Sequence, residues 1–452
     1  MYFLYSILLG IGVAALLPRF ILDALRHGKY AAGFRERTGT LPSFERRGRP
    51  VVWLHCVSVG ETQAARPLAR AVLEAYPSHA LVVSTTTMTG QRIAREAFGS
   101  SAALVFYFPF DWAWSVRRAL RTIQPSLALV METELWPRFM RECRERGVPI
   151  ALVNGRISEK SFRRYSRIKF FMKRVVGDLA LALMQTDADA ARLLALGLAP
   201  ERVKVSGNVK FDYEERAGQQ ALTNDLRSRF HFASKRPLII AASTHAPEER
   251  VVLEAYKLVT PSTTRPRLLI APRHPERFAE VASLLASSGL TWTRRNDSPR
   301  VDDQTCDVIL LDSIGELSGA YPLAEIVFVG GSIASIGGHN VLEPATAARC
   351  IVTGAHTSNF GEIVRTFLEQ SALVQLPAVE ADAAPEVLSR VLSDLLADDD
   401  TRRRMGLNAR ATLDQNRGAT SRTVRMLSPL FQERHGSEDR MSLPDKVLTS
   451  DL

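Results

Sequence analysis

In residues 51–75 the chain reads VVWLHCVSVGETQAARPLARAVLEA, and this stretch decides the fold. It begins with an apolar, β-branched run at residues 51–54 and continues through a turn that contains Gly60. A segment with apolar residues at helical spacing follows. A short continuous apolar run of this kind predicts a strand buried on both faces of a parallel sheet, and the segment after it predicts a covering helix.

The same strand, turn and helix pattern recurs along most of the chain. In the first half it predicts strands at 51–55, 81–86, 103–108, 127–131, 150–153, 181–185 and 203–206. In the second half it predicts strands at 238–242, 267–271, 308–311, 326–329, 351–353 and 373–376. Repeated strand–helix units indicate an α/β fold with two doubly wound parallel sheets, one in each half.

A polar stretch at 212–235 separates the two halves, and we expect two Rossmann-like domains that face each other across a cleft. The 452 residues are ample for two such cores. The expected divisions are an N-terminal membrane anchor at 1–30, a first domain at 31–212, a second domain at 213–434 and a loose polar tail at 435–452.

The charge balance indicates anionic partners. The chain has 58 Lys and Arg against 48 Asp and Glu, a net charge of +10. Nucleic acid, phospholipid and phosphorylated substrates all fit this charge, but no zinc-finger spacing or RNA-binding aromatic signature accompanies it, so nucleic acid is not expected. The four cysteines lie far apart without a C-x-x-C pair, so neither a disulfide framework nor a zinc site is indicated.

The N-terminal residues 1–17, MYFLYSILLGIGVAALL, carry no charge, and basic residues follow them. A spanning helix needs about 20 apolar residues, with about 17 as the lower limit. The run therefore predicts an anchor that spans the bilayer or lies in its interface, with the rest of the chain on the cytoplasmic side. A buried core helix is the alternative.

A second stretch, residues 156–174, carries eight Lys or Arg against one acid, interleaved with Phe162, Tyr165, Phe170 and Phe171. Aromatic side chains among cations suit an anionic lipid surface. A merely solvated helix face is the alternative.

Because ligands bind at the carboxyl ends of parallel strands, the residues that follow each strand are the site candidates. In the first half, Glu61 follows a glycine turn at a predicted helix start, where it is a candidate general base or simply complements the helix dipole. Glu132 follows another strand and competes with Glu134 for a charge-stabilising role. Lys210, at the domain junction, is placed to reach a leaving phosphate, and Glu36 is a reserve base.

The second half is richer in glycine, Arg and His after its strands, which predicts a phosphate site. Arg273 can contact a phosphate, a glycine-rich turn at 330–338 can offer backbone N–H groups, and the helix that starts near Asn340 places Glu343 beside ribose hydroxyls. Alternatively, Gly337 and Gly338 form only a tight turn. Neither a dinucleotide G-x-G-x-x-G fingerprint after a first strand nor a P-loop occurs.

The D-x-D sequence Asp187-Ala188-Asp189 raises the question of a metal. It opens a predicted helix, so Asp187 fits an acid at a helix N-terminus better than a metal ligand, and no metal is expected.

Seven motifs in one order, SVGE, METELWP, GN-x-K-F-D, STH-x-x-E-E, PRHPERF, GGS…GGHN-x-x-E and G-x-H-T-x-N-F, follow the apolar N-terminus. Over roughly residues 1–430 the chain resembles the 3-deoxy-D-manno-oct-2-ulosonic acid (Kdo) transferases. The resemblance implies a GT-B glycosyltransferase that transfers Kdo from CMP-Kdo to a phosphorylated lipid A precursor (lipid IVA) in lipopolysaccharide synthesis. It implies inversion, no metal or other cofactor, and a place on the anionic cytoplasmic face of the inner membrane.

The resemblance also implies roles for individual residues. The proton acceptor of the family matches Glu61, and its charge-stabilising pair matches Glu132 and Lys210. Its CMP contacts match Pro272, Arg273, Ile314, Gly315, Glu316, Asn340, Val341, Leu342 and Glu343. The segment around Glu36, RERTG, departs from the family's GERYG-like run. Three alternatives stay open: a GT-B enzyme that uses a UDP-sugar and a different lipid acceptor, a sugar-nucleotide epimerase of the same fold, and a non-catalytic membrane scaffold.

Overall fold

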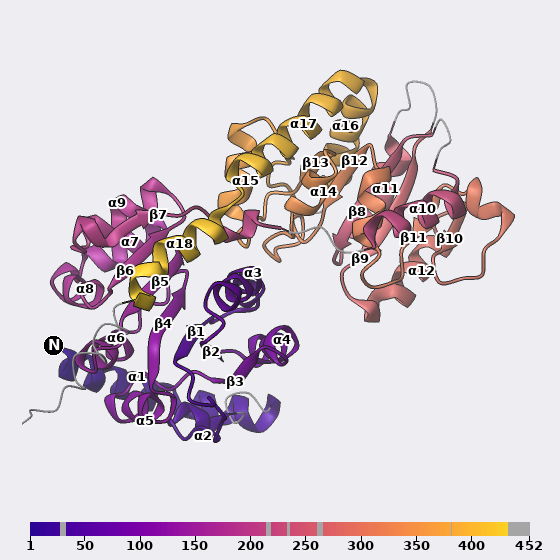
Figure 1. The fold of residues 1–452 in the computed structure, drawn as a ribbon. Helices are drawn as coiled ribbons and strands as arrows, with labels where there is room; N and C mark the ends of the chain where they lie inside the picture. Colours follow the sequence, from indigo (N-terminus) through magenta and orange to yellow (C-terminus); the bar gives the residue numbers. More distant parts are fainter. Residues whose placement is uncertain (28–32, 214–217, 233–235, 260–264, 381, 433–452) are drawn as a thin grey trace, which may run out of the picture. The chain divides into compact units, whose positions relative to one another are not determined.

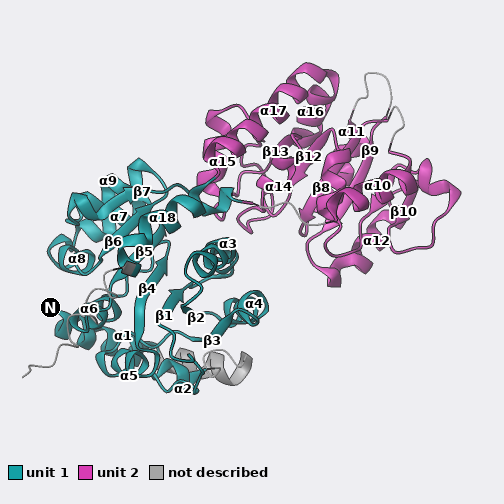
Figure 2. Ribbon diagram, in the orientation of Figure 1, with its two compact units in different colours: residues 1–212, 418–452 teal, residues 213–417 magenta. Residues whose placement is uncertain are grey.

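The computed structural model describes residues 1–27, 33–213, 218–232, 236–259, 265–380 and 382–432, with side chains of the first helix described up to Leu16. The chain forms two compact units, shown in separate colours in Figure 2. Unit 1 comprises Met1–Asp212 and the segment from Gly418 onward, and unit 2 comprises Tyr213–Arg417.

Unit 1 is built on a seven-stranded sheet in the order β3-β2-β1-β4-β5-β6-β7, in which all pairs of neighbouring strands are parallel. The strands are β1 (Val51–His55), β2 (Ala80–Thr85), β3 (Ala102–Tyr107), β4 (Pro125–Met131), β5 (Ile150–Gly155), β6 (Leu181–Met184) and β7 (Val203–Val205). Trp53 packs into the core on one face of the sheet and Leu54 into the core on the other. Both faces are therefore buried, which is why the strands are continuous apolar runs.

Helices cover both faces of this sheet (Figure 1). They are α1 (Tyr2–His27), α2 (Phe34–Arg37), α3 (Val59–Ala75), α4 (Met88–Phe98), α5 (Ala113–Ile123), α6 (Pro137–Glu145), α7 (Glu159–Ser166), α8 (Lys169–Val176), α9 (Asp187–Ala195) and α18 (Ala419–Gln432), with short 3₁₀ turns at Pro200–Arg202 and Val209–Phe211.

Unit 2 repeats the architecture with a parallel sheet in the order β10-β11-β9-β8-β12-β13-β14. Its strands are β8 (Leu238–Thr244), β9 (Arg267–Pro272), β10 (Trp292–Arg294), β11 (Val308–Leu310), β12 (Ile326–Val329), β13 (Cys350–Thr353) and β14 (Val374–Gln375). Its helices are α10 (Gln219–Phe230), α11 (Glu248–Leu258), α12 (Phe278–Ala286), α13 (Leu317–Ala320), α14 (Leu342–Thr346), α15 (Gly361–Glu369), α16 (Ala384–Ala397) and α17 (Asp399–Asn416), and its 3₁₀ turns are Pro275–Arg277, Val301–Gln304 and Tyr321–Leu323.

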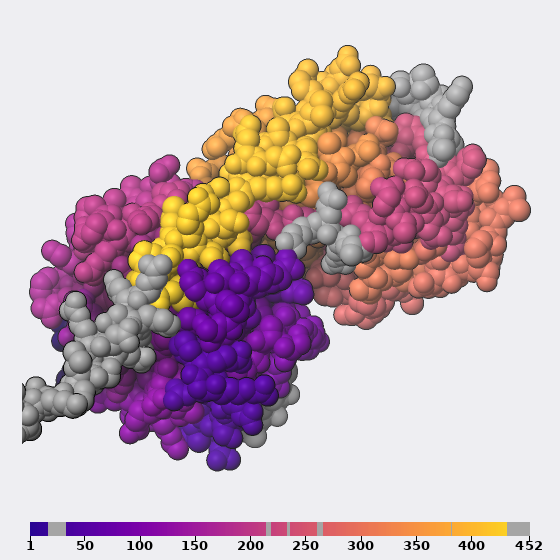
Figure 3. All heavy atoms as spheres, in the orientation of Figure 1, coloured from indigo at the N-terminus to yellow at the C-terminus, as the bar shows by residue number. Residues whose placement is uncertain are grey.

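The last helix, α18, belongs to unit 1, so the assignment of all of 213–434 to the second domain is wrong. Leu427 and Phe431 of α18 join the core that lies under α3, and Phe431 stacks on Tyr76 with ring centroids 3.7 Å apart. Figure 3 shows the yellow atoms of this segment against the violet atoms of unit 1. At the crossing, the carboxylate of Asp212 accepts the backbone N–H groups of Gly418 and Thr420, both at 2.5 Å. The expected tail at 435–452 lies outside the described residues.

The first helix forms, but nowhere in the described residues is there a helix long and apolar enough to cross a bilayer. The spanning form of the expected anchor is therefore not supported. Part of α1 instead packs on unit 1: the Tyr2 hydroxyl donates to Asp178 at 2.6 Å and the Tyr5 hydroxyl donates to Asp111 at 2.9 Å. Residues 28–30 of the expected anchor lie outside the described residues.

Candidate active site

The candidate base Glu61 lies in the first turn of α3, just after β1. Ser58 caps this helix, and its hydroxyl donates to Glu61 Oε1 at 3.0 Å, while the Val57 N–H donates to Glu61 Oε2 at 2.8 Å. Two donors thus fix the orientation of the carboxylate.

Glu61 is only 8% exposed, and this burial raises the pKa of its carboxyl to about 7. The hydrogen bond from Val57 lowers the pKa, and the nearby carboxylates of Glu132 and Glu134 raise it further. The sequence suggested that the helix N-terminus would favour the ionised form, but the desolvation of the carboxyl outweighs that effect. A pKa near 7 is well matched to a general base at neutral pH.

Glu132 follows β4, the strand next to β1, and its backbone is left-handed with φ of 52°. Few non-glycine residues adopt this conformation, and strain of this kind is concentrated at functional sites. The turn places the buried carboxylate against two cations: Lys210 Nζ lies 2.8 Å from Oε1, and Arg156 Nη2 lies 3.7 Å from Oε2.

Strand order explains why these residues meet. The chain leaves β1 toward β2 on one side and reaches β4 on the other, so the switch point of the sheet lies between β1 and β4. Glu61 and Glu132 follow the two strands that flank this point, where α/β folds bind ligands. Lys210 is held there because the Val209 N–H, next to it in the 3₁₀ turn, donates to Asn154 Oδ1 at 3.1 Å.

Two other acids are placed differently. The pKa of Glu134 is raised to about 7, chiefly by burial, so it remains a competitor for proton transfer. The reserve base Glu36 accepts the backbone N–H of Tyr107 at 2.7 Å, which gives it a structural partner at the end of β3.

The D-x-D acids open α9, as the sequence predicted. Asp189 accepts the N–H of Ile157 at 2.9 Å and the hydroxyl of the capping Thr186 at 2.6 Å, and it pairs with Arg192. Within the described ranges, no group of three or more His, Cys, Asp or Glu residues could hold a metal ion.

The candidate donor residues of unit 2 follow β9, β11 and β12, three strands of one sheet. Arg273 directly follows β9, its side chain is exposed, and in the described part of the chain it has no acidic partner within 4.0 Å. Pro272 is the buried end of that strand. An unpaired arginine at a strand end is suited to an anionic ligand.

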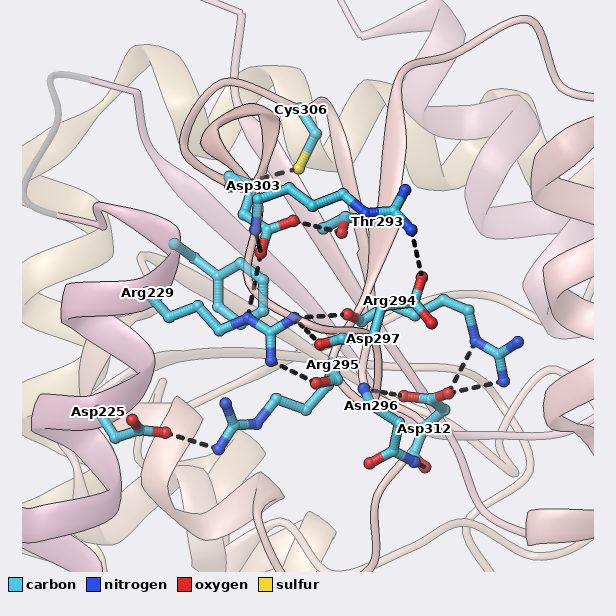
Figure 4. A network of polar contacts seen from close by, with 12 residues as sticks. Asp225, Arg229, Thr293, Arg294, Arg295, Asn296, Asp297, Asp303, Cys306 and Asp312 are labelled. Atoms are coloured by element: carbon cyan, nitrogen blue, oxygen red, sulfur yellow. Dashed lines mark hydrogen bonds and ion pairs between the residues drawn. The ribbon is translucent and has the colours of Figure 1, made fainter.

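The second donor segment, 314–316, is anchored from both ends. Glu316 pairs with Arg295 at 2.8 Å, and this arginine lowers the pKa of the carboxyl. Just before the segment, buried Asp312 pairs with Arg294 at 2.8 Å and accepts the Asn296 N–H at 3.0 Å (Figure 4). Between these anchors Ile314 is exposed and Gly315 has φ of 89°.

The third segment, 340–343, forms the start of α14, as expected. Asn340 Oδ1 accepts the Leu342 N–H at 3.0 Å and its amide donates to Glu343 Oε1 at 3.3 Å, while Val341 and Leu342 are buried. Asn340 therefore fixes the orientation of Glu343, which could accept ribose hydroxyls.

The first part of the glycine-rich turn, residues 331–334, already binds a carboxylate of the protein itself. The N–H groups of Gly331, Ser332, Ile333 and Ala334 all donate to the buried carboxylate of Glu248, at 2.7 to 3.2 Å. His245 and His339, whose Nε2 atoms lie 2.8 Å apart, were not singled out from the sequence. Their place after β8 and β12 was the available signal, because each lies in a strand-end motif.

Comparison with known proteins agrees with this architecture. Residues 32–213 match the family described as 3-Deoxy-D-manno-octulosonic-acid transferase (kdotransferase). The 3-deoxy-D-manno-octulosonic acid transferase of Haemophilus influenzae is 33% identical over 430 residues, which cover 95% of this chain and 99% of the relative. The enzyme of the same description from Bordetella pertussis is 35% identical over 82% of this chain and 86% of its own length.

Among solved structures, a glycosyltransferase from Rickettsia africae has the same fold, with a TM-score of 0.54 at 11% identity over 85% of this chain and 99% of that one. The two parallel-sheet units are thus consistent with GT-B. Since a relative that aligns with almost the whole sequence is 33% identical to it, the chain belongs to the 3-deoxy-D-manno-octulosonic acid (Kdo) transferases, a family of glycosyltransferases.

Proposed function

We propose that this Kdo transferase moves Kdo from CMP-Kdo to a phosphorylated lipid A precursor, with inversion and without a metal, in lipopolysaccharide synthesis. The observation that carries the proposal is the Glu61 carboxyl, which is buried, oriented by two donors and raised by burial to a pKa of about 7, in the same sheet end as the Glu132–Lys210 pair.

In the proposed step, Glu61 accepts the proton of an acceptor hydroxyl as its oxygen forms a bond to the anomeric carbon of Kdo. The bond from that carbon to the phosphate oxygen breaks, and its electrons leave with CMP. Lys210 and Arg273 are the candidate cations for the departing phosphate. Glu61 and Lys210 belong to unit 1 and Arg273 belongs to unit 2, so the proposed step draws on residues of both units.

For the donor we propose contacts from Arg273, the 314–316 segment and the 340–343 segment. Arg273 has no acidic partner in the part of the chain that the structure describes, which supports an anionic ligand there. Glu343, oriented by Asn340, is a candidate acceptor for the ribose hydroxyls.

For the acceptor side we propose that unit 1 lies on the anionic cytoplasmic surface of the inner membrane. Five residues of the first three turns of α1 leave an apolar stripe exposed at helical spacing: Phe3, Leu4, Ile7, Leu8 and Ile11. Such a stripe fits a helix lying in the interface.

A cationic pocket of about 500 Å³ adjoins the start of α1 and supports the same orientation. It is lined by Tyr2, Arg141, Arg144, Phe170, Lys173, Arg174, Gly177 and Asp178. Of the four aromatic residues in the basic stretch, only Phe170 is largely exposed, at 70%, whereas the other three pack against the core. Among the four, Phe170 is therefore the side chain that we propose for contact with lipid.

The decisive experiment measures transfer from labelled CMP-Kdo to a tetra-acylated lipid A precursor in detergent micelles, for wild type and Glu61→Gln. We expect Glu61→Gln to lower kcat by about 10²- to 10⁴-fold, since that is the usual contribution of a general base, with CMP affinity unchanged. Glu74→Gln, on the exposed side of the same helix, is the matched control.

Turnover within about tenfold of wild type in Glu61→Gln would remove Glu61 from the base role. The same loss in Glu134→Gln, with Glu61→Gln active, would transfer the role to Glu134. If UDP competes with the donor and CMP does not, the donor is a UDP-sugar and not CMP-Kdo. If no Kdo is transferred to the lipid A precursor, the acceptor is a different molecule.

A further inference from the structure

Two imidazole rings meet at the switch point of the unit 2 sheet. His245 follows β8 and His339 follows the turn after β12, the strand beside β8. Their Nε2 atoms are 2.8 Å apart, and the rings are nearly parallel at 10°. Two nitrogens at this distance share one proton, because two lone pairs or two N–H groups would repel each other.

A buried carboxylate positions both rings. Glu248 accepts the backbone N–H of His245 at 3.0 Å and also four N–H groups of the turn that precedes His339. The backbone of His339 is tied to the same turn, since its N–H donates to the Gly330 carbonyl at 3.2 Å. The backbone positions of both histidines are therefore fixed by the same carboxylate and turn at the end of the sheet.

A third histidine and an arginine lie close to the pair. The His274 ring lies 5.1 Å from that of His245, and Arg273 follows the adjacent strand β9. Glu249 raises the pKa of His245, but its carboxylate is already bound by Arg277 at 2.8 Å and by the Thr244 hydroxyl at 2.9 Å. Burial lowers the pKa of both histidines, to about 4 for His339, and the positive charge of Arg273 lowers it further. Without a ligand the pair is therefore neutral at pH 7.

The proton count of such a pair determines what it can bind. In the neutral pair one ring carries its proton on Nε2 and the other on Nδ1, so one Nδ1 is a donor and the other is bare. Neither Nδ1 has a hydrogen-bond partner among the residues that the structure describes. One proton added to the bare Nδ1 gives an imidazolium that still donates its Nε2–H to the other ring, and both Nδ1 atoms then donate. A second proton would set two N–H groups against each other.

We propose that the His245–His339 pair binds an anionic group of the nucleotide-sugar donor and takes up one proton from solvent as that group binds. The covalent bond formed is Nδ1–H, the bond broken is the one that held the proton on hydronium or on a buffer acid in solution, and no other covalent bond changes. The inference rests on the proposed function, because it assumes a donor at Arg273. The group is an oxyanion, which the phosphate of CMP and the carboxylate of the sugar acid both provide.

The test is calorimetric titration of the full-length protein with CMP at pH 7.5, in two buffers of different ionisation enthalpy. We expect wild type to take up between about half a proton and one proton more per CMP than His245→Gln or His339→Gln does, because only wild type can form the charged pair. Each variant should also bind CMP about tenfold more weakly, the size of one charge-assisted hydrogen bond. His231→Asn, an exposed histidine at the end of α10, should behave as wild type.

Three further titrations separate the possible outcomes. Cytidine, which has no phosphate, should show no proton uptake that depends on the pair. If CMP-Kdo causes proton uptake that requires the His245–His339 pair and CMP does not, the anionic group bound by the pair is the carboxylate of the sugar acid. The third titration uses only the wild-type protein, so it does not depend on whether the variants fold. Above pH 7 its CMP affinity should fall by up to tenfold per pH unit, and the ionisation of the CMP phosphate alone should not explain the whole fall.

Equal proton uptake in wild type and both variants, with normal CMP binding, overturns the inference and leaves the proposed function intact. Failure of wild type to bind either CMP or CMP-Kdo overturns both.

Discussion

Lys210 Nζ lies 2.8 Å from Oε1 of Glu132, and this ion pair sits at the switch point of the unit 1 sheet, where Glu132 acts electrostatically on Glu61. The lysine side chain is 17% exposed and the glutamate side chain 7%, so solvent screens the pair only weakly. Lys210 therefore limits how strongly Glu132 raises the pKa of the candidate base.

We predict that Lys210→Met moves the acidic limb of the kcat/KM profile to higher pH. Without the cation, the negative charge of Glu132 acts on Glu61 more strongly, so a higher pH is needed to ionise the base. The measurement is the pH profile of Kdo transfer from pH 5.5 to 9. Lys204→Met, which alters a lysine exposed on β7, is the control. An unshifted acidic limb in Lys210→Met would show that the Glu132–Lys210 pair does not tune Glu61.

Glu61 should cost the folded protein stability at neutral pH. Its pKa is about 7 in the folded state against 4.5 for an ordinary Glu, so the ionised form is disfavoured by folding. The resulting decrease in the free energy of unfolding is absent below pH 4.5 and grows as pH rises to 7. Above pH 7 it is constant, on the order of 3 kcal/mol. We predict that Glu61→Gln is more resistant than wild type to urea at pH 8 and equal to it near pH 4.5. Wild type that is equally or more resistant at pH 8 would contradict the raised pKa.

Glu248 should be the most sensitive carboxylate of unit 2. In Glu248→Gln, the five backbone N–H groups that donate to Glu248 would lose a charged acceptor, and the new side-chain NH₂ group would face other donors. The free energy of unfolding should therefore fall by about 2–4 kcal/mol. We predict faster amide hydrogen exchange at Gly331–Ala334 and a lower urea midpoint. Glu254→Gln, farther along the same helix and paired only at the surface with Arg250, should change neither. Unchanged exchange in Glu248→Gln would show that the turn holds its shape without the charge.

The cationic pocket beside α1 should govern binding to anionic bilayers. We predict that reversal of two charges, in Lys173→Glu with Arg174→Glu, lowers sedimentation with phosphatidylglycerol vesicles at least tenfold, because each cation near such a surface contributes about 1 kcal/mol. Sedimentation with phosphatidylcholine vesicles should be unaffected. The double variant Arg390→Glu with Arg403→Glu, which reverses two exposed charges on α16 and α17 of unit 2, is the charge-matched control. An equal loss in the control would mean that net charge, and not this pocket, binds the bilayer.

The strands were predictable because burial on both faces leaves an unbroken apolar run. Val51–His55 and Ile326–Val329 have the predicted bounds, and most other strands differ by one or two residues at an end. The edge strand β10, Trp292–Arg294, was not predicted, because three residues ending in an arginine give no apolar run.

Glu61, Glu132 and Arg273 could be found as candidates because ligands bind at the carboxyl ends of parallel strands, and the sequence shows where the strands end. The sequence could not show that Glu248 fills the glycine turn, because that contact joins residues more than 80 positions apart. Nor could it show that α18 returns to unit 1, because its apolar stripe fits either core. The roles of the site residues stay predictions until the variants above are assayed.

The two hydrogen bonds that Asp212 accepts from Gly418 and Thr420 hold the start and the end of unit 2 next to each other. Unit 2 is therefore one uninterrupted insertion, and residues 213–417 can be excised as a single piece whose two ends were neighbours. The remainder, in contrast, is discontinuous, and it needs a short bridge from 212 to 418 to keep its last helix. Deletion from the C-terminus would remove α18, with Leu427 and Phe431, from a core of the first unit before it reached the second.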